Sequence, residues 1–70
     1  MKNISQAFLI EKGFIKDPTR NTRWFYREIG GTLGIENSGI FVFYFFGSNL
    51  RIEYEEDMLF MIGLIEYKSK

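Results

Sequence analysis

GIFVFYFF, the stretch Gly39–Phe46, decides the fold of this 70-residue chain, because every position after the glycine is apolar or aromatic. A β-strand sends alternate side chains to opposite faces of its sheet. The strand predicted over Ile40–Phe46 therefore places hydrophobic side chains on both faces. A chain this short has enough helix to cover one face but seldom both. The second face therefore predicts a partner or a dimer.

Short loops containing glycine separate this strand from three other predicted strands, at Thr22–Ile29, Thr32–Glu36 and Leu50–Tyr54. Gly30-Gly31 has the composition of a two-residue hairpin turn, and residues 37–39 and 47–49 have that of three-residue hairpin loops. Loops of this length join successive strands in an antiparallel meander. Asp17–Arg20 is predicted to be a turn before the first strand.

Helices are predicted at both ends of the chain. The first covers Asn3–Lys12, with Asn3 as its N-cap and Gly13 as the left-handed residue beyond its end. The second covers Glu55–Tyr67 and carries apolar residues at helical spacing, namely Met58, Met61, Ile62 and Ile65. Gly63 predicts a close approach of this helix to the sheet or to the other helix.

The predicted fold class is therefore α+β: a single domain, residues 1–70, with a four-stranded antiparallel β-meander flanked by an N-terminal and a C-terminal α-helix (α-β-β-β-β-α). The loop lengths set a register in which Ile35 lies opposite Phe41, Leu33 opposite Phe43 and Phe45 opposite Arg51, and this register sorts the strand side chains by face. One face collects Trp24, Tyr26, Leu33, Ile35, Phe41, Phe43, Phe45 and Arg51. The other collects Phe25, Ile29, Ile40, Val42, Tyr44, Phe46, Leu50, Ile52 and Tyr54.

The second set is the more aliphatic and β-branched one, so we predict that it forms the core and is covered by both helices. A two-residue loop at Gly47 would instead move Leu50 and Ile52 to the face of Trp24, and the core could then change sides.

The first set, left outside in this assignment, has the aromatic and arginine composition of a protein-binding hot spot. The predicted partner-binding residues are Trp24, Tyr26, Phe41, Phe43 and Arg51, with Arg23 and Arg27 as flanking charges. The expected partner is another protein or a second copy of the chain, in a homodimeric scaffold or an antitoxin-like protein. RNA is an alternative partner, because aromatic sheet faces flanked by arginines stack bases.

The composition argues against catalysis. The chain has no histidine and no cysteine, and so lacks the commonest general base, the strongest nucleophile and the usual zinc ligands. The acidic residues Glu53, Glu55, Glu56 and Asp57 could hold a divalent cation, but they are better explained as the charged start of a helix. Nine basic residues balance nine acidic ones, unlike the basic excess of general nucleic-acid binders. We predict no catalytic residue, cofactor or metal.

No stretch approaches the ~20 apolar residues that cross a bilayer, and no targeting signal is recognisable. We therefore expect no membrane partner and a cytoplasmic location.

In size and make-up the chain resembles the small accessory proteins of phages and mobile elements, such as anti-CRISPR inhibitors. The resemblance covers the whole length but is one of architecture: a compact, cysteine-free α+β domain without a catalytic constellation. No motif is shared, so no functional position is transferred. The resemblance implies inhibition by binding, in which the small domain occupies or distorts a site on a larger nuclease or on its guide RNA.

Overall fold

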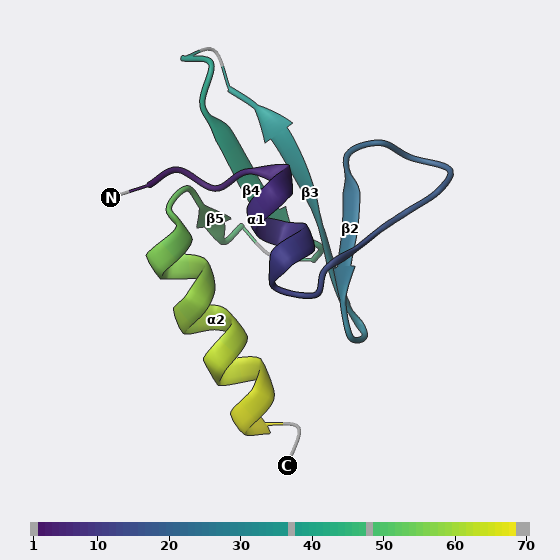
Figure 1. The fold of residues 1–70 in the computed structure, drawn as a ribbon, viewed down its shortest axis with the longest axis vertical. Helices are drawn as coiled ribbons and strands as arrows, with labels where there is room; N and C mark the ends of the chain where they lie inside the picture. Colours follow the sequence, from purple (N-terminus) through teal and green to yellow (C-terminus); the bar gives the residue numbers. More distant parts are fainter. Residues whose placement is uncertain (1, 37, 48, 69–70) are drawn as a thin grey trace.

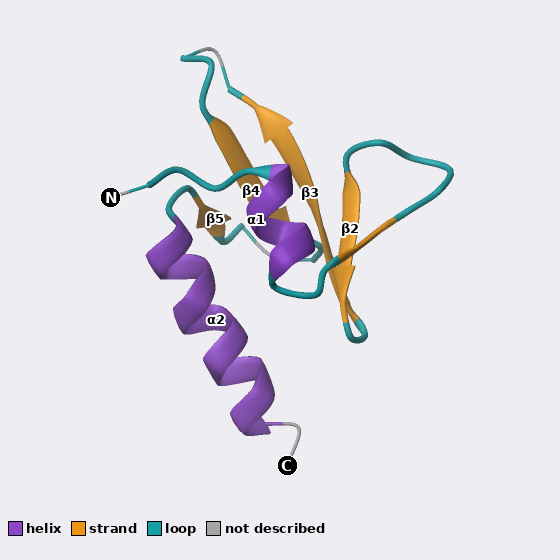
Figure 2. Ribbon diagram, in the orientation of Figure 1, coloured by secondary structure: helices purple, strands orange, loops and turns teal. Residues whose placement is uncertain are grey.

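The computed structural model describes residues 2–36, 38–47 and 49–68, and within them two helices lie on one side of a five-stranded antiparallel sheet (Figure 1, Figure 2). The helices are α1 (Gln6–Glu11) and α2 (Glu55–Lys68). The strands, in both chain and spatial order, are β1 (Ile15–Lys16), β2 (Arg23–Tyr26), β3 (Ile29–Ile35), β4 (Phe41–Phe45) and β5 (Arg51–Ile52). The predicted α+β meander is confirmed, with one strand more than expected. Asn37 and Ser48, in the two predicted hairpin loops, lie outside the described residues.

Helix α1 begins later than predicted, because the residues before it are extended. The Ile4 N–H donates to the Glu53 carbonyl at 2.9 Å, and Asn3 forms an antiparallel bridge with Tyr54. Asn3 is therefore not the N-cap. Ser5 takes that position, and its hydroxyl oxygen accepts the Phe8 N–H at 3.2 Å. Gly13 has φ +96°, which confirms its predicted left-handed conformation.

Helix α2 ends within one residue of its predicted bounds. Met58 and Ile65 are buried, and Met61 and Ile62 pack half-buried against the core, as their spacing predicts. The expectation for Gly63 is wrong: a Cβ added there would meet no atom within 4 Å. This glycine lies on the outer side of the helix.

Strand β1 was not predicted, because two residues carry too little pattern to be recognised. Ile15 pairs with Phe25, and Lys16 pairs with Trp24. The predicted turn at Asp17–Arg20 lies between β1 and β2. Its Asp17 carboxylate accepts both the backbone N–H and the hydroxyl of Thr19, at 2.8 and 2.7 Å.

The β2–β3 turn lies at Arg27-Glu28 rather than at Gly30-Gly31, because Tyr26 pairs with Ile29. Arg27 carries the positive φ, 57°, that this tight turn requires. The two glycines lie inside β3 instead, because aromatic rings occupy the space above them. A Cβ on Gly30 would come within 2.6 Å of the Phe25 ring, and one on Gly31 within 2.3 Å of the Phe43 ring.

The β3–β4 register is as predicted, with Ile35 opposite Phe41 and Leu33 opposite Phe43. The β4–β5 register is not: Phe43 faces Ile52, whereas the prediction paired Phe45 with Arg51. This is the alternative register, in which Ile52 joins the face of Trp24. A shift of one residue moves every side chain of a strand to the other face.

The core therefore lies on the opposite face from the one we predicted. The buried cluster joins α1, α2 and the Trp24 face of the sheet, and consists of Ile4, Phe8, Leu9, Phe14, Trp24, Leu33, Phe43, Phe45, Ile52 and Met58. Its rings pack edge to face, with the Phe43 centroid 5.0 Å from Phe45 and 5.7 Å from Phe14. Both helices cover one face, as expected, but it is the more aromatic one.

Candidate functional site

The aromatic residues predicted as partner contacts belong to the covered face. Trp24 is 1% exposed and Phe43 is 0% exposed, so neither is accessible to a partner in this structure. Phe41 is half-buried against the core, and so is Tyr26. The assignment of this face to the surface is wrong because it depended on the β4–β5 register.

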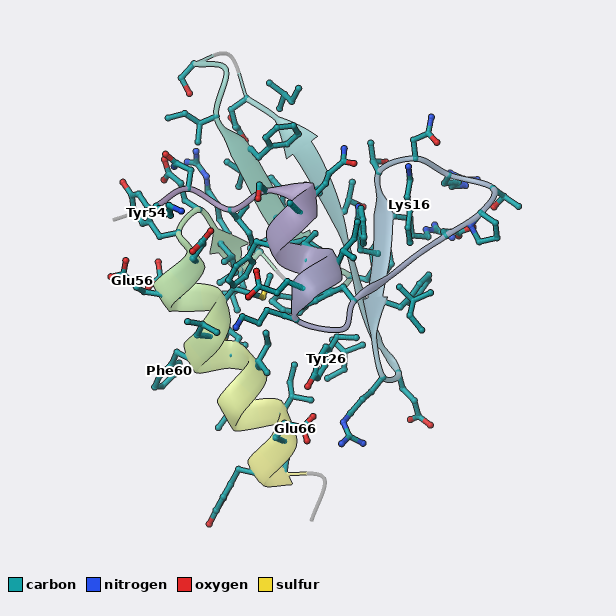
Figure 3. All side chains as sticks on the ribbon, viewed as in Figure 1. Lys16, Tyr26, Tyr54, Glu56, Phe60 and Glu66 are labelled. Atoms are coloured by element: carbon teal, nitrogen blue, oxygen red, sulfur yellow. The ribbon has the colours of Figure 1, made fainter. Side chains whose placement is uncertain are left out.

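The three predicted arginines separate into two groups. Arg27 binds Glu66 of α2 through two hydrogen bonds of 2.8 Å, from Nε and Nη2, and the same carboxylate accepts the Tyr26 hydroxyl at 2.6 Å. Figure 3 shows Tyr26 and Glu66 facing each other between the sheet and α2. The hydrogen bond to Glu66 raises the pKa of Tyr26, and the same carboxylate raises the pKa of Arg27. Arg27 therefore fastens α2 to the β2–β3 turn.

Arg23 and Arg51 lie on the face of the sheet that the helices leave uncovered. The register places them in one row across four strands, in the order Arg23, Thr32, Tyr44 and Arg51. The neighbouring row contains Ile15, Phe25, Gly30 and, through a backbone hydrogen bond to Gly30, Phe46. We call the side chains of these two rows the open face: Ile15, Arg23, Phe25, Thr32, Tyr44, Phe46 and Arg51.

Large apolar and aromatic side chains are exposed on the open face. Ile15 is 71% exposed, Phe46 45% and Tyr44 38%. Val42, farther along β4 on the same side, is buried. On this side of the sheet, the exposed apolar surface therefore lies toward the end of β4 that carries Tyr44 and Phe46.

The aromatic side chains of the open face hold one another in place. The rings of Phe25 and Phe46 meet edge to face, with centroids 6.1 Å apart, above Gly30. The guanidinium of Arg23 lies 5.0 Å from the Phe46 centroid, as in a cation–π contact, and 3.9 Å from the Asp17 carboxylate. Hydrogen bonds from Thr19, together with the charge of Arg23, lower the pKa of Asp17. The Phe46 ring thus contacts both an arginine and a second phenylalanine.

Tyr44 is oriented by a hydrogen bond of 2.6 Å from its hydroxyl to the Glu36 carboxylate. This bond raises the pKa of Tyr44, and the burial of the hydroxyl acts in the same direction. The phenol is therefore a neutral donor at physiological pH, with its ring directed along the open face.

Sequence reasoning assigned Phe25, Tyr44 and Phe46 to the core, and so missed them as surface residues. The signal that could have found them is on β3, the central strand. Its open-face positions are Gly30, Thr32 and Gly34, which have no large side chain to fill a core.

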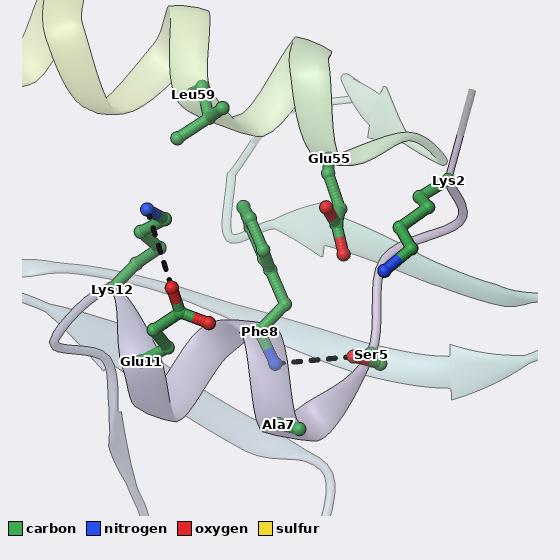
Figure 4. Close-up of a pocket in the computed structure, with 8 residues that line it drawn as sticks. All are labelled: Lys2, Ser5, Ala7, Phe8, Glu11, Lys12, Glu55 and Leu59. Atoms are coloured by element: carbon green, nitrogen blue, oxygen red, sulfur yellow. Dashed lines mark hydrogen bonds and ion pairs between the residues drawn. The ribbon is translucent and has the colours of Figure 1, made fainter.

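A second candidate site is the cleft between α1 and α2, which encloses about 420 Å³ (Figure 4). Phe8 and Leu59 provide its apolar surface, and the Lys12 ammonium lies 3.8 Å from Glu11 and 5.8 Å from the Phe8 ring centroid. None of the described polar or charged residues is buried. The cleft thus contains no fixed, desolvated charge of the kind that orients a substrate.

The acidic residues at the start of α2 form no metal site: no group of three potential ligands is placed to hold an ion within residues 2–36, 38–47 and 49–68. In the same ranges, neither helix has the length and the apolar composition that crossing a membrane requires.

Among the described residues, the open face is therefore the surface with the clearest features of a binding site. No protein-family model, no curated protein and no solved structure matches this chain.

Proposed function

We propose that this chain is a small non-enzymatic binding domain that engages a protein partner with the open face of its sheet. The observation that carries the proposal is the exposure of Phe46, Tyr44 and Ile15 beside two arginines, on the side that both helices leave uncovered. A contiguous exposed apolar patch on a small domain is typical of an interaction site.

The composition of the open face supports a protein partner. Tyrosine, phenylalanine and arginine are the side chains enriched at interface cores and hot spots. The rings of Phe25 and Phe46 are already packed against each other, so binding would immobilise few additional rotamers. Arg23 and Arg51 flank the aromatic side chains, and they favour a partner that carries carboxylates around an apolar site.

The class of partner follows from the resemblance to phage and mobile-element inhibitors. In that form of the proposal, the partner is a host-defence nuclease and the domain inhibits it by occupying a site, without catalysis of its own. The absence of histidine and cysteine from the chain agrees with a role that needs no chemistry.

Site-specific photo-crosslinking in cells of the source organism tests the proposal. A photoreactive phenylalanine at position 46 is compared with the same residue at Glu28, which is exposed in the β2–β3 turn away from the open face. We expect one discrete protein adduct from position 46 and none from position 28. The adduct should disappear when Tyr44→Ala is added. Equal adducts from both positions, or none from position 46, would contradict the proposal.

RNA is the second candidate, because Arg23 and Arg51 lie at the two ends of the row that contains the exposed Tyr44 ring, and sequence-tolerant single-strand binders combine basic and aromatic side chains in this way. Fluorescence anisotropy with a labelled 12-nucleotide oligo-uridine tests it directly. Two phosphate contacts predict about a sevenfold loss of affinity between 50 and 200 mM salt. Binding with that salt dependence, abolished by Arg23→Ala with Arg51→Ala, would favour RNA over a protein.

A further inference from the structure

Helix α2 is apolar on its outer side as well as on its inner side. Phe60 and Tyr67 are each 72% exposed, and Leu64 is 43% exposed. Figure 3 shows Phe60 directed away from the sheet. The spacing of Phe60, Gly63, Leu64 and Tyr67 places them on one side of the helix, opposite Met58 and Ile65.

A second apolar side on a helix whose inner side already packs in the core is typical of a surface that another protein chain covers. The core covers the inner side of α2, but the described residues leave the outer side to solvent. Gly63 lies in the middle of the outer side with no atom within 4 Å of the Cβ it lacks, so another backbone could approach closely there.

We propose that a second copy of this chain covers the outer side of α2, in an antiparallel helix pair that crosses near Gly63. The charges of α2 favour this occupant. Its first turn carries Glu55, Glu56 and Asp57, and its last turn carries Lys68. In an antiparallel pair each acidic end meets the basic end of the other copy, whereas a parallel pair would place like charges together.

The spacing along the helix agrees with this arrangement. For two copies centred on Gly63, Asp57 of one lies about 1.5 Å along the axis from Lys68 of the other, at a rise of 1.5 Å per residue. Phe60 of one copy and Tyr67 of the other are likewise about 1.5 Å apart along the axis. The interface therefore repeats one aromatic contact and one ion pair on each side of its two-fold axis, as an isologous dimer requires.

The available area is that of a weak, transient interface. The three exposed apolar side chains of the outer side, Phe60, Leu64 and Tyr67, contribute roughly 400 Å² per copy, or about 800 Å² in total, which is below the 1,200 Å² of standard stable interfaces. The dimer should therefore be reversible and populated at micromolar or higher concentrations. The dimer does not depend on the protein that binds the open face, and the open face remains accessible in this arrangement.

Sedimentation velocity of the full chain from 5 to 500 µM tests the proposal. We expect a monomer–dimer equilibrium whose dissociation constant rises about tenfold or more in Phe60→Ala. Asp57→Lys alone and Lys68→Glu alone should each weaken the dimer, and the two changes together should restore it. The control Phe46→Ala, on the open face, should leave the equilibrium unchanged. A monomer at every concentration would overturn the proposal, and sensitivity to Phe46→Ala would place the interface on the sheet instead.

A disulfide test locates the crossing point of the two helices. The chain has no cysteine, so Gly63→Cys introduces one thiol at the crossing point, where a side chain has room. We expect Gly63→Cys to form a covalent dimer on mild oxidation, and the control Glu28→Cys to remain monomeric under reducing and oxidising conditions alike. Circular dichroism of both variants confirms that they are folded. Equal cross-linking of the two folded variants would overturn the crossing of the helices at Gly63, whereas their antiparallel direction is tested by the charge exchange at Asp57 and Lys68.

Discussion

Gly31→Ala and Gly34→Ala make the same chemical change three residues apart on β3, and we expect them to have opposite effects on stability. A Cβ at Gly31 would lie 2.3 and 2.5 Å from two carbons of the Phe43 ring and 2.5 Å from the Tyr44 carbonyl oxygen. These distances are well below the 3.4–4 Å of ordinary van der Waals contact. The backbone oxygen cannot move without separating β3 from β4.

The Phe43 ring cannot move either. It is 0% exposed and packs between Phe14 and Phe45. Overpacking a core of this kind destabilises by about 1–3 kcal/mol, and occasionally by more. We expect Gly31→Ala to lie at the upper end, about 3 kcal/mol. A 70-residue domain has a total stability of roughly 4–10 kcal/mol, so this is a large share of it.

Gly34→Ala differs because no atom lies within 4 Å of the added methyl group, and no positive φ restricts the backbone there. The substitution mainly reduces the conformational entropy of the unfolded chain, which should stabilise the protein by about 0.4–1 kcal/mol. Gly30→Ala should fall between the two, because its Cβ would meet the edges of the Phe25 and Phe46 rings, which lie on the open face and can rotate toward solvent.

Urea unfolding followed by tryptophan fluorescence measures these effects, because Trp24 is the single tryptophan and is buried. With a slope of about 1 kcal/mol per molar urea, Gly31→Ala should lower the midpoint by about 3 M, and Gly34→Ala should raise it slightly. Equal midpoints for these two variants would refute the reasoning. That result would mean that β3 needs its glycines for backbone conformation rather than for close packing.

Three further predictions concern the helices and their contacts. Ser5→Ala should lower the free energy of unfolding by about 1 kcal/mol, because it removes the N-cap of α1, and an unchanged urea midpoint would contradict that role. Met58→Ala should lower it by about 2–5 kcal/mol, since Met58 is 0% exposed in the core, and a loss below 1 kcal/mol in the same assay would show that the site collapses around the smaller side chain. The raised pKa of Tyr26 means that its hydrogen bond to Glu66 stabilises the fold fully below the ordinary tyrosine value of 10.0, and that this contribution is lost as pH rises through the folded-state value. Thermal melts from pH 8 to 11 should therefore fall less steeply for Tyr26→Phe than for the wild type, and parallel profiles would contradict this linkage.

Local patterns predicted the helices and one strand pair correctly. The spacing of Met58, Met61, Ile62 and Ile65 identified the inner side of α2, because this pattern can be recognised within the helix without knowledge of the sheet. The β3–β4 register was also predicted, since Leu33 and Phe43 are joined by a short hairpin whose length determines the pairing.

The side of the sheet that forms the core could not be predicted, because it depends on a single residue in the loop between β4 and β5. That residue decides whether Ile52 lies on the same face of the sheet as Trp24 or on the opposite face. Both faces of β4 are apolar, so either face could form the core. The prediction of a turn at Gly30-Gly31 failed for a related reason. The sequence does not distinguish a glycine that makes room for an aromatic ring from a glycine that allows a turn. Of the predicted partner-binding residues, only Arg23 and Arg51 lie on the open face, and Arg51 was predicted on the same face as Trp24.

The alternation of core and open-face side chains along the same strands has a practical consequence for engineering. On β4, Phe43 and Phe45 fill the core while Tyr44 between them faces outward, and on β2 the buried Trp24 lies between Arg23 and Phe25. The outward positions on these strands can thus be randomised in a display library while every second residue continues to specify the fold. Positions 23, 25, 32, 44, 46 and 51 would form one contiguous paratope across the sheet, on a scaffold of 70 residues that folds without disulfides.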